Sequence, residues 1–118
     1  MEKIEKDKIR KKELNKLKRI FKELPGDKKK LAESLIQQAA FMVSTLAELQ
    51  EILNTDGAVE LFEQGAQKML REHPAAKTYN SMIKNYSTVC KQLMDLLPDD
   101  KNKSTEDELM AFVKKAKK

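Results

Sequence analysis

The chain has 118 residues, of which 36% are charged and 5% aromatic, with three glycines, three prolines and no tryptophan. This composition favours helix and argues against a sandwich or barrel, so we expect an all-α fold. Cys90 is the only cysteine, which excludes an internal disulfide, and no apolar run approaches the ~20 residues that span a bilayer. The charged N-terminus does not resemble a secretory signal, so we expect a cytosolic protein.

The formal net charge of +5 is unevenly distributed along the chain. Residues 1–30 carry 13 Lys and Arg against 6 Asp and Glu, whereas residues 31–76 carry 2 against 7. A positive segment attached to a mildly acidic body is a common arrangement for binding nucleic-acid phosphates. The alternative is a solvated helix face that serves only solubility.

Residues 1–30 form the first predicted unit, a basic N-terminal helical arm. Its sparse apolar residues recur at helical spacing, and they are Ile9, Leu14, Leu17, Phe21 and Leu24. Pro25 and Gly26 end this helix. We expect its cations, with a second cluster just after it, to bind DNA phosphates and to supply affinity more than sequence choice. These residues are Lys8, Arg10, Lys11, Lys12, Lys16, Lys18, Arg19, Lys22, Lys28, Lys29 and Lys30.

Residues 31–98 form the second predicted unit, a hairpin of two long antiparallel helices. Asp27 is expected to cap the first of these helices, which runs to about Leu53. Pro74 suits the first turn of the second helix, which places His73 at the N-cap of that helix. We expect the same helix to end by Leu97, because Pro98 follows. Both helices carry an apolar line with alternating steps of three and four. The two lines are Leu35, Ala39, Met42, Leu46, Leu49 and Leu53, and Tyr79, Met82, Tyr86, Val89, Leu93 and Leu96.

A second apolar line lies beside the first on each helix and is wider than one partner helix would cover. We therefore expect a closed homo-oligomer that buries the excess between subunits. The expected interface residues are Ile36, Val43, Ile83 and Leu97.

The segment that connects the two long helices, residues 58–72, has a weaker helical period. It predicts either a short β-hairpin with Gly65 at its turn or an irregular loop with one helical turn.

Residues 99–118 form the last predicted unit, a polar linker and a short helix from Thr105 to Lys118. Its modest apolar face, Leu109, Phe112 and Val113, is expected to dock a protein partner. The alternative is that this helix folds back on the hairpin or frays.

Motifs for catalysis are missing from the sequence. There is one His and one Cys, with no paired metal-ligand spacing, glycine-rich phosphate loop or nucleophile elbow. His73 beside a proline and Cys90 in an apolar stripe both favour structural roles. We therefore expect a protein that is not an enzyme and that needs neither a cofactor nor a metal.

The order of short motifs between Leu31 and Pro98 resembles the small terminase subunits of tailed bacteriophages, in particular the group with His-Pro or Asn-Pro before the last long helix. One helix ends in Leu-Gln-Glu-Ile-Leu-Asn-Thr-Asp-Gly at residues 49–57, and Val59 and Gly65 follow. Glu-His-Pro-Ala-Ala-Lys at residues 72–77 opens the next helix, which ends in Leu-Met-Asp-Leu-Leu-Pro at residues 93–98. The chain departs from the family in its short length and in having no helix-turn-helix pattern before the hairpin.

The resemblance implies a non-enzymatic, ring-forming component of a viral genome-packaging motor in the cytoplasm of the infected bacterial host. Such a subunit recognises double-stranded viral DNA and delivers it to a large terminase subunit that holds the ATPase and nuclease, which is then the partner expected for the last helix. The competing hypothesis is a helical adaptor or regulatory protein-interaction module without DNA binding. RNA binding is less favoured, because Phe21 is the only aromatic residue in the basic segment that could stack on bases.

Overall fold

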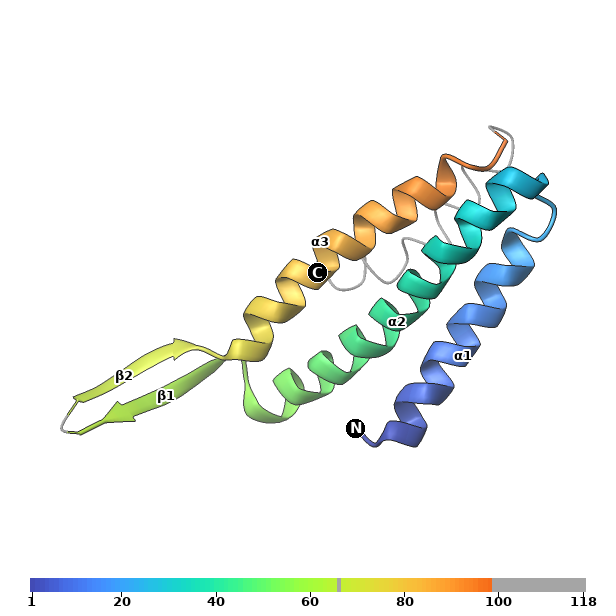
Figure 1. Cartoon of the computed structure of the whole chain (residues 1–118). Helices are drawn as coiled ribbons and strands as arrows, with labels where there is room; N and C mark the ends of the chain where they lie inside the picture. Colours follow the sequence, from blue (N-terminus) through green and yellow to red (C-terminus); the bar gives the residue numbers. More distant parts are fainter. Residues whose placement is uncertain (66, 99–118) are drawn as a thin grey trace.

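In the computed structural model, which describes residues 1–65 and 67–98 apart from the side chains of residues 60, 62 and 64, three helices and a β-hairpin follow one another (Figure 1). α1 spans Lys3–Ile20, α2 spans Gly26–Asp56 and α3 spans Pro74–Met94, with β1 (Val59–Gln64) and β2 (Gln67–Glu72) between α2 and α3. α2 packs against both α1 and α3. The expected helical fold is thereby confirmed, while the predicted last helix, Thr105 to Lys118, lies outside the described residues. No described helix combines the length and the apolarity needed to cross a membrane.

The ends of α2 follow from its glycine and proline residues. α2 begins at Gly26 directly after Pro25, so Asp27 lies in the first turn of α2. The expectation that Asp27 is the N-cap is therefore wrong. A carboxylate in the first turn still interacts favourably with the helix dipole. At the other end the backbone of Gly57 has φ +83°, a left-handed conformation that glycine adopts without the steric cost of a Cβ.

α3 begins where the His-Pro pair predicts. Nδ1 of His73 accepts a hydrogen bond from the backbone N–H of Ala75 at 3.0 Å, and Pro74 occupies the first helical position. Because Nδ1 accepts this bond, the ring proton of a neutral His73 lies on Nε2, which is 3.2 Å from Oδ2 of Asp56 near the end of α2. His73 therefore both caps α3 and ties it to the end of α2.

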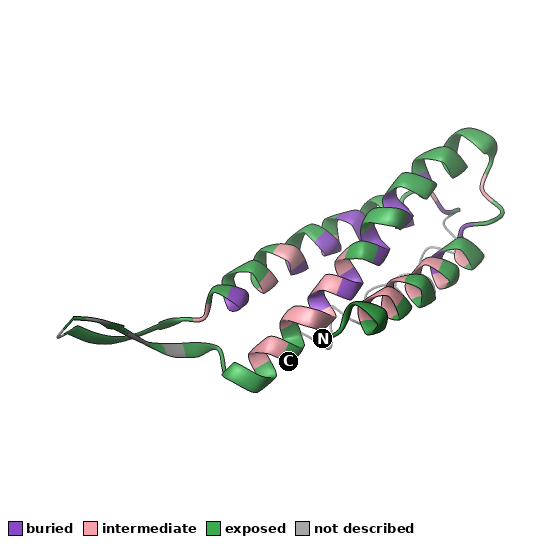
Figure 2. Cartoon of the chain, turned by 60° about the horizontal axis from the view of Figure 1, so that its bottom comes forward, coloured by how far each residue is buried: buried purple, intermediate pink, exposed green. Residues whose placement is uncertain are grey.

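The core lies along the inner faces of all three helices (Figure 2). α2 presents small residues there, with Ala32, Ala39 and Ala40 each 1% exposed, which allows close helix packing. Leu17 of α1 and Phe21, which directly follows α1, are exposed by 1% and 2% and join this core. The described core is completed by the larger side chains of α2, of α3 and of the turn after α3, chiefly Leu35, Ile36, Val43, Leu46, Ile83, Tyr86, Val89, Cys90, Leu93, Met94 and Leu97.

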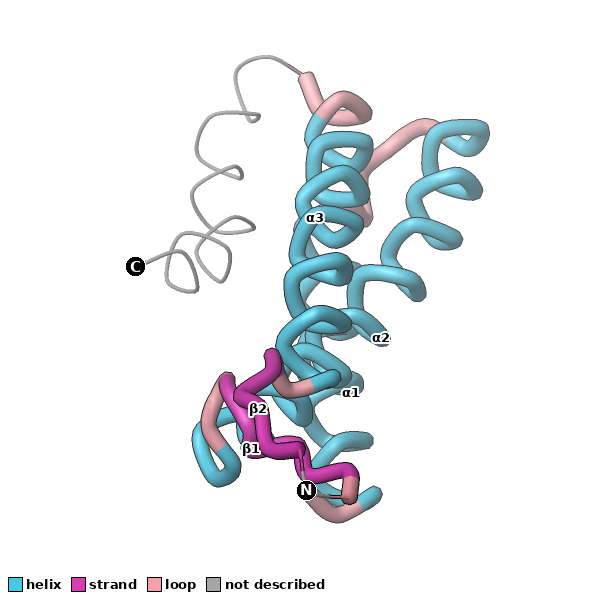
Figure 3. Tube along the Cα trace, turned by 90° about the vertical axis from the view of Figure 1, so that its left-hand side faces the viewer, coloured by secondary structure: helices cyan, strands magenta, loops and turns pink. Residues whose placement is uncertain are grey.

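The segment between α2 and α3 is a β-hairpin, which decides between the two alternatives left by the sequence. β1 pairs with β2 in antiparallel register, from Val59 opposite Glu72 to Gln64 opposite Gln67. Gly65 in the turn has φ +61°, as tight two-residue hairpin turns require. The hairpin projects from the end of the helical bundle, beyond the start of α3 and the end of α2 (Figures 1 and 3).

Candidate nucleic-acid interface

The solvent face of α1 is a continuous cationic surface. Positions separated by steps of three and four lie on one side of a helix. In α1 and the turn after it these exposed positions are Lys8, Lys11, Lys12, Asn15, Lys18, Arg19 and Lys22, which we call the α1 basic face. It contains six cations, one amide and no acid; the nearest exposed acids, Glu5 and Glu23, stand at its two ends.

The opposite side of α1 explains why these cations point outward. Leu17 and Phe21 anchor the second half of the helix in the core. In the first half, Nζ of Lys6 lies 3.4 Å from Oε1 of Glu48 and 5.6 Å from the ring centre of Phe41. These contacts fix the rotation of α1 about its own axis and thereby the orientation of the α1 basic face.

The N-terminus of the chain adds a further contact between α1 and α2. Its amino group lies 3.4 Å from Oε1 of Glu51. Acids of α2 thus neutralise cations at the inner side of α1, whereas Lys8, Lys11, Lys12, Lys18 and Lys22 of the outer side form no ion pair with any acid among the described residues.

A groove at one end of the bundle joins the two cationic clusters that are separate in sequence. Lys18 near the end of α1 and Lys22 in the turn after it line this groove together with Lys29 from the first turns of α2. Its walls include Phe21 and Ile36, and Glu33 is the acid that lines it. The α1 basic face therefore continues, across this groove, onto the start of α2.

The other predicted DNA-binding residues are placed differently. Arg10 is half-buried beside a groove that Phe41 also lines, and Nζ of Lys16 pairs with Oε1 of Glu13 at 3.1 Å. Lys28 lines a different pocket, between the α1–α2 turn and the end of α3, and Lys30 is exposed. Arg10 and Lys16 thus belong to the side of α1 that faces the bundle.

The four residues expected at an oligomer interface are core residues of the single chain, which corrects the reasoning that selected them. Ile36, Val43, Ile83 and Leu97 are exposed by only 3 to 9% without any second subunit. The two long helices alone would leave part of these apolar faces uncovered. In the structure α1 packs on that hairpin, and Leu17 and Phe21 join these residues in one core cluster. Their burial therefore gives no reason for a partner subunit.

Two titratable side chains, Tyr86 and Cys90, are buried in the described core. Burial raises the pKa of the Cys90 thiol to about 11, so the thiolate is scarce at neutral pH. Burial likewise raises the pKa of the Tyr86 hydroxyl, which forms a hydrogen bond with the Cys90 side chain. The described part of the chain also holds no cluster of three His, Cys, Asp or Glu side chains that could bind a metal ion.

Two further surfaces were missed at the level of sequence. Leu31 and Phe41 are each 53% exposed on α2, although both belong to a helix whose other large apolar residues are mostly covered. The described apolar residues of the β-hairpin, Val59, Leu61, Met69 and Leu70, are also exposed, and the weakened three-four period is the signal that sets this segment apart from the helices in the sequence.

The predicted partner-docking residues, Leu109, Phe112 and Val113, lie outside the described residues.

Comparison of the chain with protein-family models, with curated proteins and with solved structures gave no match.

Proposed function

We propose that this protein is a non-enzymatic DNA-binding protein of the small terminase type, which holds double-stranded DNA through the α1 basic face. The observation that carries the proposal is that six cations and no acid occupy the outward side of α1 and the turn after it, and that packing fixes the rotation of this helix. Lys8 to Arg19 spans about 16 Å along the helix axis. Over that length one DNA strand presents about five phosphates along the duplex axis.

The chemistry of the face suits phosphates better than base edges. Lysine and arginine bind phosphate oxygens through charge and hydrogen bonds, whereas bases are read by groups placed in a groove. Asn15 is the one amide on the α1 basic face, and it lies midway along it. We therefore expect DNA affinity with little sequence preference from this helix alone.

The assignment to the small terminase type rests on the motif resemblance of residues 31–98. By that resemblance the protein would form a ring and deliver DNA to a large subunit with ATPase and nuclease activities. The single chain offers no support for Ile36, Val43, Ile83 or Leu97 as the ring interface, because these side chains are buried in it. DNA binding by the α1 basic face is a separate part of the proposal and can be tested without the ring.

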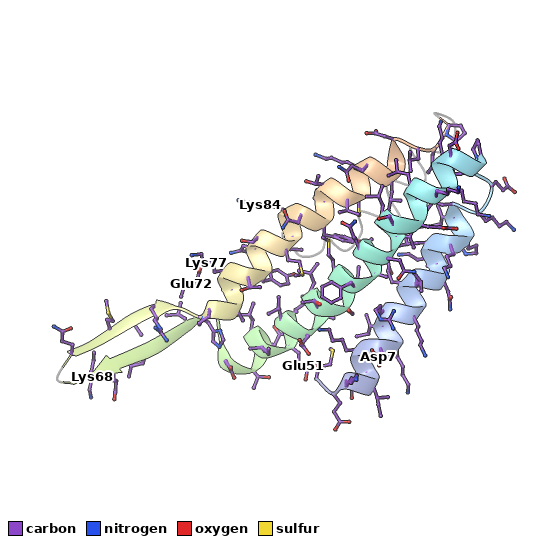
Figure 4. The ribbon with its side chains drawn as sticks, in the orientation of Figure 1. Asp7, Glu51, Lys68, Glu72, Lys77 and Lys84 are labelled. Atoms are coloured by element: carbon purple, nitrogen blue, oxygen red, sulfur yellow. The ribbon has the colours of Figure 1, made fainter. Side chains whose placement is uncertain are left out.

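The test compares two triple variants of the full chain that remove the same charge. Lys11→Gln, Lys18→Gln and Lys22→Gln together neutralise half of the α1 basic face. The control is Lys77→Gln, Lys84→Gln and Lys91→Gln, three exposed lysines of α3. Lys77 and Lys84 lie on the side of α3 that faces away from α1 and α2 (Figure 4).

The measurement is fluorescence anisotropy of a labelled DNA duplex titrated with each protein at several salt concentrations. The α1 variant should bind more weakly, and the slope of log affinity against log salt should become shallower by about 2.7 if all three lysines contact phosphates. The α3 variant should bind as the wild type does. Equal weakening by both variants would mean that only net charge matters, and a wild type indifferent to DNA would favour the adaptor hypothesis.

A further inference from the structure

The β-hairpin is a surface that nothing in the described chain covers. β1 and β2 pack against each other, and all nine of their described side chains are exposed. Val59, Leu61 and Leu70 on one face of the hairpin are exposed by 55%, 57% and 72%. An isolated two-stranded hairpin is marginally stable in water, and its unpaired edges are templates for another strand.

The hydrogen-bonding phase of the hairpin shows which residues form its edges. The backbone N–H of His73 donates to the carbonyl of Ala58 at 2.8 Å, which makes this pair a hydrogen-bonded one. Pairs alternate along an antiparallel ladder, so the next pair, Val59 and Glu72, is not hydrogen-bonded and its backbone groups point outward. The same holds for every second residue after it, and the outward set of β2 is Glu72, Leu70 and Lys68.

This outward set is complementary to itself. When two copies of β2 run antiparallel with Leu70 opposite Leu70, Lys68 of each copy lies opposite Glu72 of the other. Figure 4 shows Lys68 toward the tip of the hairpin and Glu72 at its base, which is the separation that this pairing needs. The paired edges thus gain one apolar pair and two ion pairs.

The outer edge of β1 is a poorer match, both for itself and for β2. Its outward residues are Val59, Leu61 and Glu63. Two antiparallel copies of β1 would set Glu63 opposite Val59 and form no ion pair. A β1 edge against a β2 edge would form one ion pair, between Glu63 and Lys68, which already pair at 3.7 Å within the hairpin.

We propose that a second copy of this chain pairs with the outer edge of β2, giving a four-stranded antiparallel sheet in the order β1–β2–β2–β1 with a two-fold axis at Leu70. This pairing covers the most exposed of the large apolar side chains described, Leu70. It requires neither DNA nor the α1 basic face. A six-residue edge buries less than the ~800 Å² per partner of a standard stable interface, so the pairing is weak unless another contact reinforces it.

A charge-swap cycle on the full chain tests this pairing by sedimentation equilibrium. Lys68→Glu and, separately, Glu72→Lys each place like charges opposite one another twice, and should raise the dimer dissociation constant about tenfold or more. The double variant Lys68→Glu/Glu72→Lys restores both ion pairs between the copies and should dimerise more tightly than either single variant, although it loses the pair between positions 63 and 68 within each hairpin. Pairing of β2 with β1 predicts no such rescue, because the carboxylate introduced at position 68 would then oppose Glu63. Failure of the double variant to recover, or a wild type that stays monomeric at concentrations on the order of 1 mM, would overturn the proposal.

Oxidative cross-linking gives an independent readout of the two-fold axis. Leu70→Cys places two thiols opposite each other and should form a covalent dimer under mild oxidation, while the matched variant Leu61→Cys should not. Cys90 contributes no background, because its side chain is fully buried in the core. Equal cross-linking of both variants, or cross-linking of Leu61→Cys alone, contradicts the assigned edge. Unchanged helical circular dichroism verifies that each variant is folded.

Discussion

The helical bundle and the β-hairpin contain similar apolar residues, but the bundle buries them and the hairpin exposes them. Leu46 and Leu93 of the bundle have no exposed surface, whereas Leu61 and Leu70 of the hairpin are exposed by 57% and 72%. In the bundle, apolar residues recur at the helical period and meet a second and a third helix. In the hairpin the described apolar residues, Val59, Leu61, Met69 and Leu70, meet only the opposite strand. Burial of a leucine therefore depends on what its element packs against, and the hairpin has nothing described to pack against.

The largest expected effect separates the two regions directly. Leu93→Ala should lower the free energy of unfolding by about 2 to 5 kcal/mol, because it removes a fully buried side chain and leaves a cavity. Leu70→Ala, the same change at an exposed position, should alter it by about 0.5 kcal/mol or less. Urea denaturation of both variants, at a concentration where the chain is monomeric, provides the measurement. A Leu70→Ala variant as unstable as Leu93→Ala would mean that the hairpin is packed in the monomer.

The sequence predicts the helices and their boundaries better than it predicts which side chains the packed bundle buries and which it exposes. Helix boundaries could be assigned because Pro25, Gly57 and the His73–Pro74 pair have strong local preferences, and the turn at Gly65 has one as well. The site could be predicted only in part. The cations of α1 are evident in the sequence, but which of them face outward depends on Leu17, Phe21 and the pair between Lys6 and Glu48.

The predicted oligomer interface shows why the rest could not be inferred. The width of the apolar faces on the two long helices indicates that something further must cover them, but a sequence does not say which element supplies the cover. α1 is so rich in charge that its few apolar residues gave little sign of packing. Leu17 and Phe21 nevertheless bury almost completely, because two anchors spaced four residues apart lie on one side of a helix.

An intermediate effect is expected from the buried thiol of the bundle. The pKa of Cys90 is raised from 9.0 to about 11 in the folded chain, so the folded state keeps the thiol proton at pH values where the unfolded state loses it. Stability from this group is therefore complete below about pH 9 and is lost as the pH rises through 11. The loss in the free energy of unfolding amounts to at most about 3 kcal/mol. Cys90→Ala has no thiol and therefore lacks this pH dependence.

Urea unfolding of the wild type and of Cys90→Ala at several pH values between 8 and 11 isolates this contribution from other alkaline titrations. The difference between the two proteins should shrink as the pH rises. A difference that stays constant across the range would show that the thiol titrates alike in the folded and unfolded states. No residue of the hairpin should give a comparable pH effect, because its described side chains are exposed.

The smallest expected effect lies at the border between the two regions, at His73. Its side chain caps α3 through Nδ1 and contacts Asp56 through Nε2, while its backbone N–H closes the base of the hairpin. His73→Ala removes the cap and should cost about 1 kcal/mol in the free energy of unfolding. His73→Asn should retain most of that stability, because a side-chain amide oxygen can accept the same bond from the N–H of Ala75. The contact with Asp56 contributes little, since the carboxylate is half exposed and such pairs are worth less than about 1 kcal/mol. Urea denaturation of both His73 variants and of Asp56→Asn separates the cap from the contact with Asp56. If His73→Asn and Asp56→Asn are each as unstable as His73→Ala, then His73 stabilises the protein through its contact with Asp56 and not through the cap.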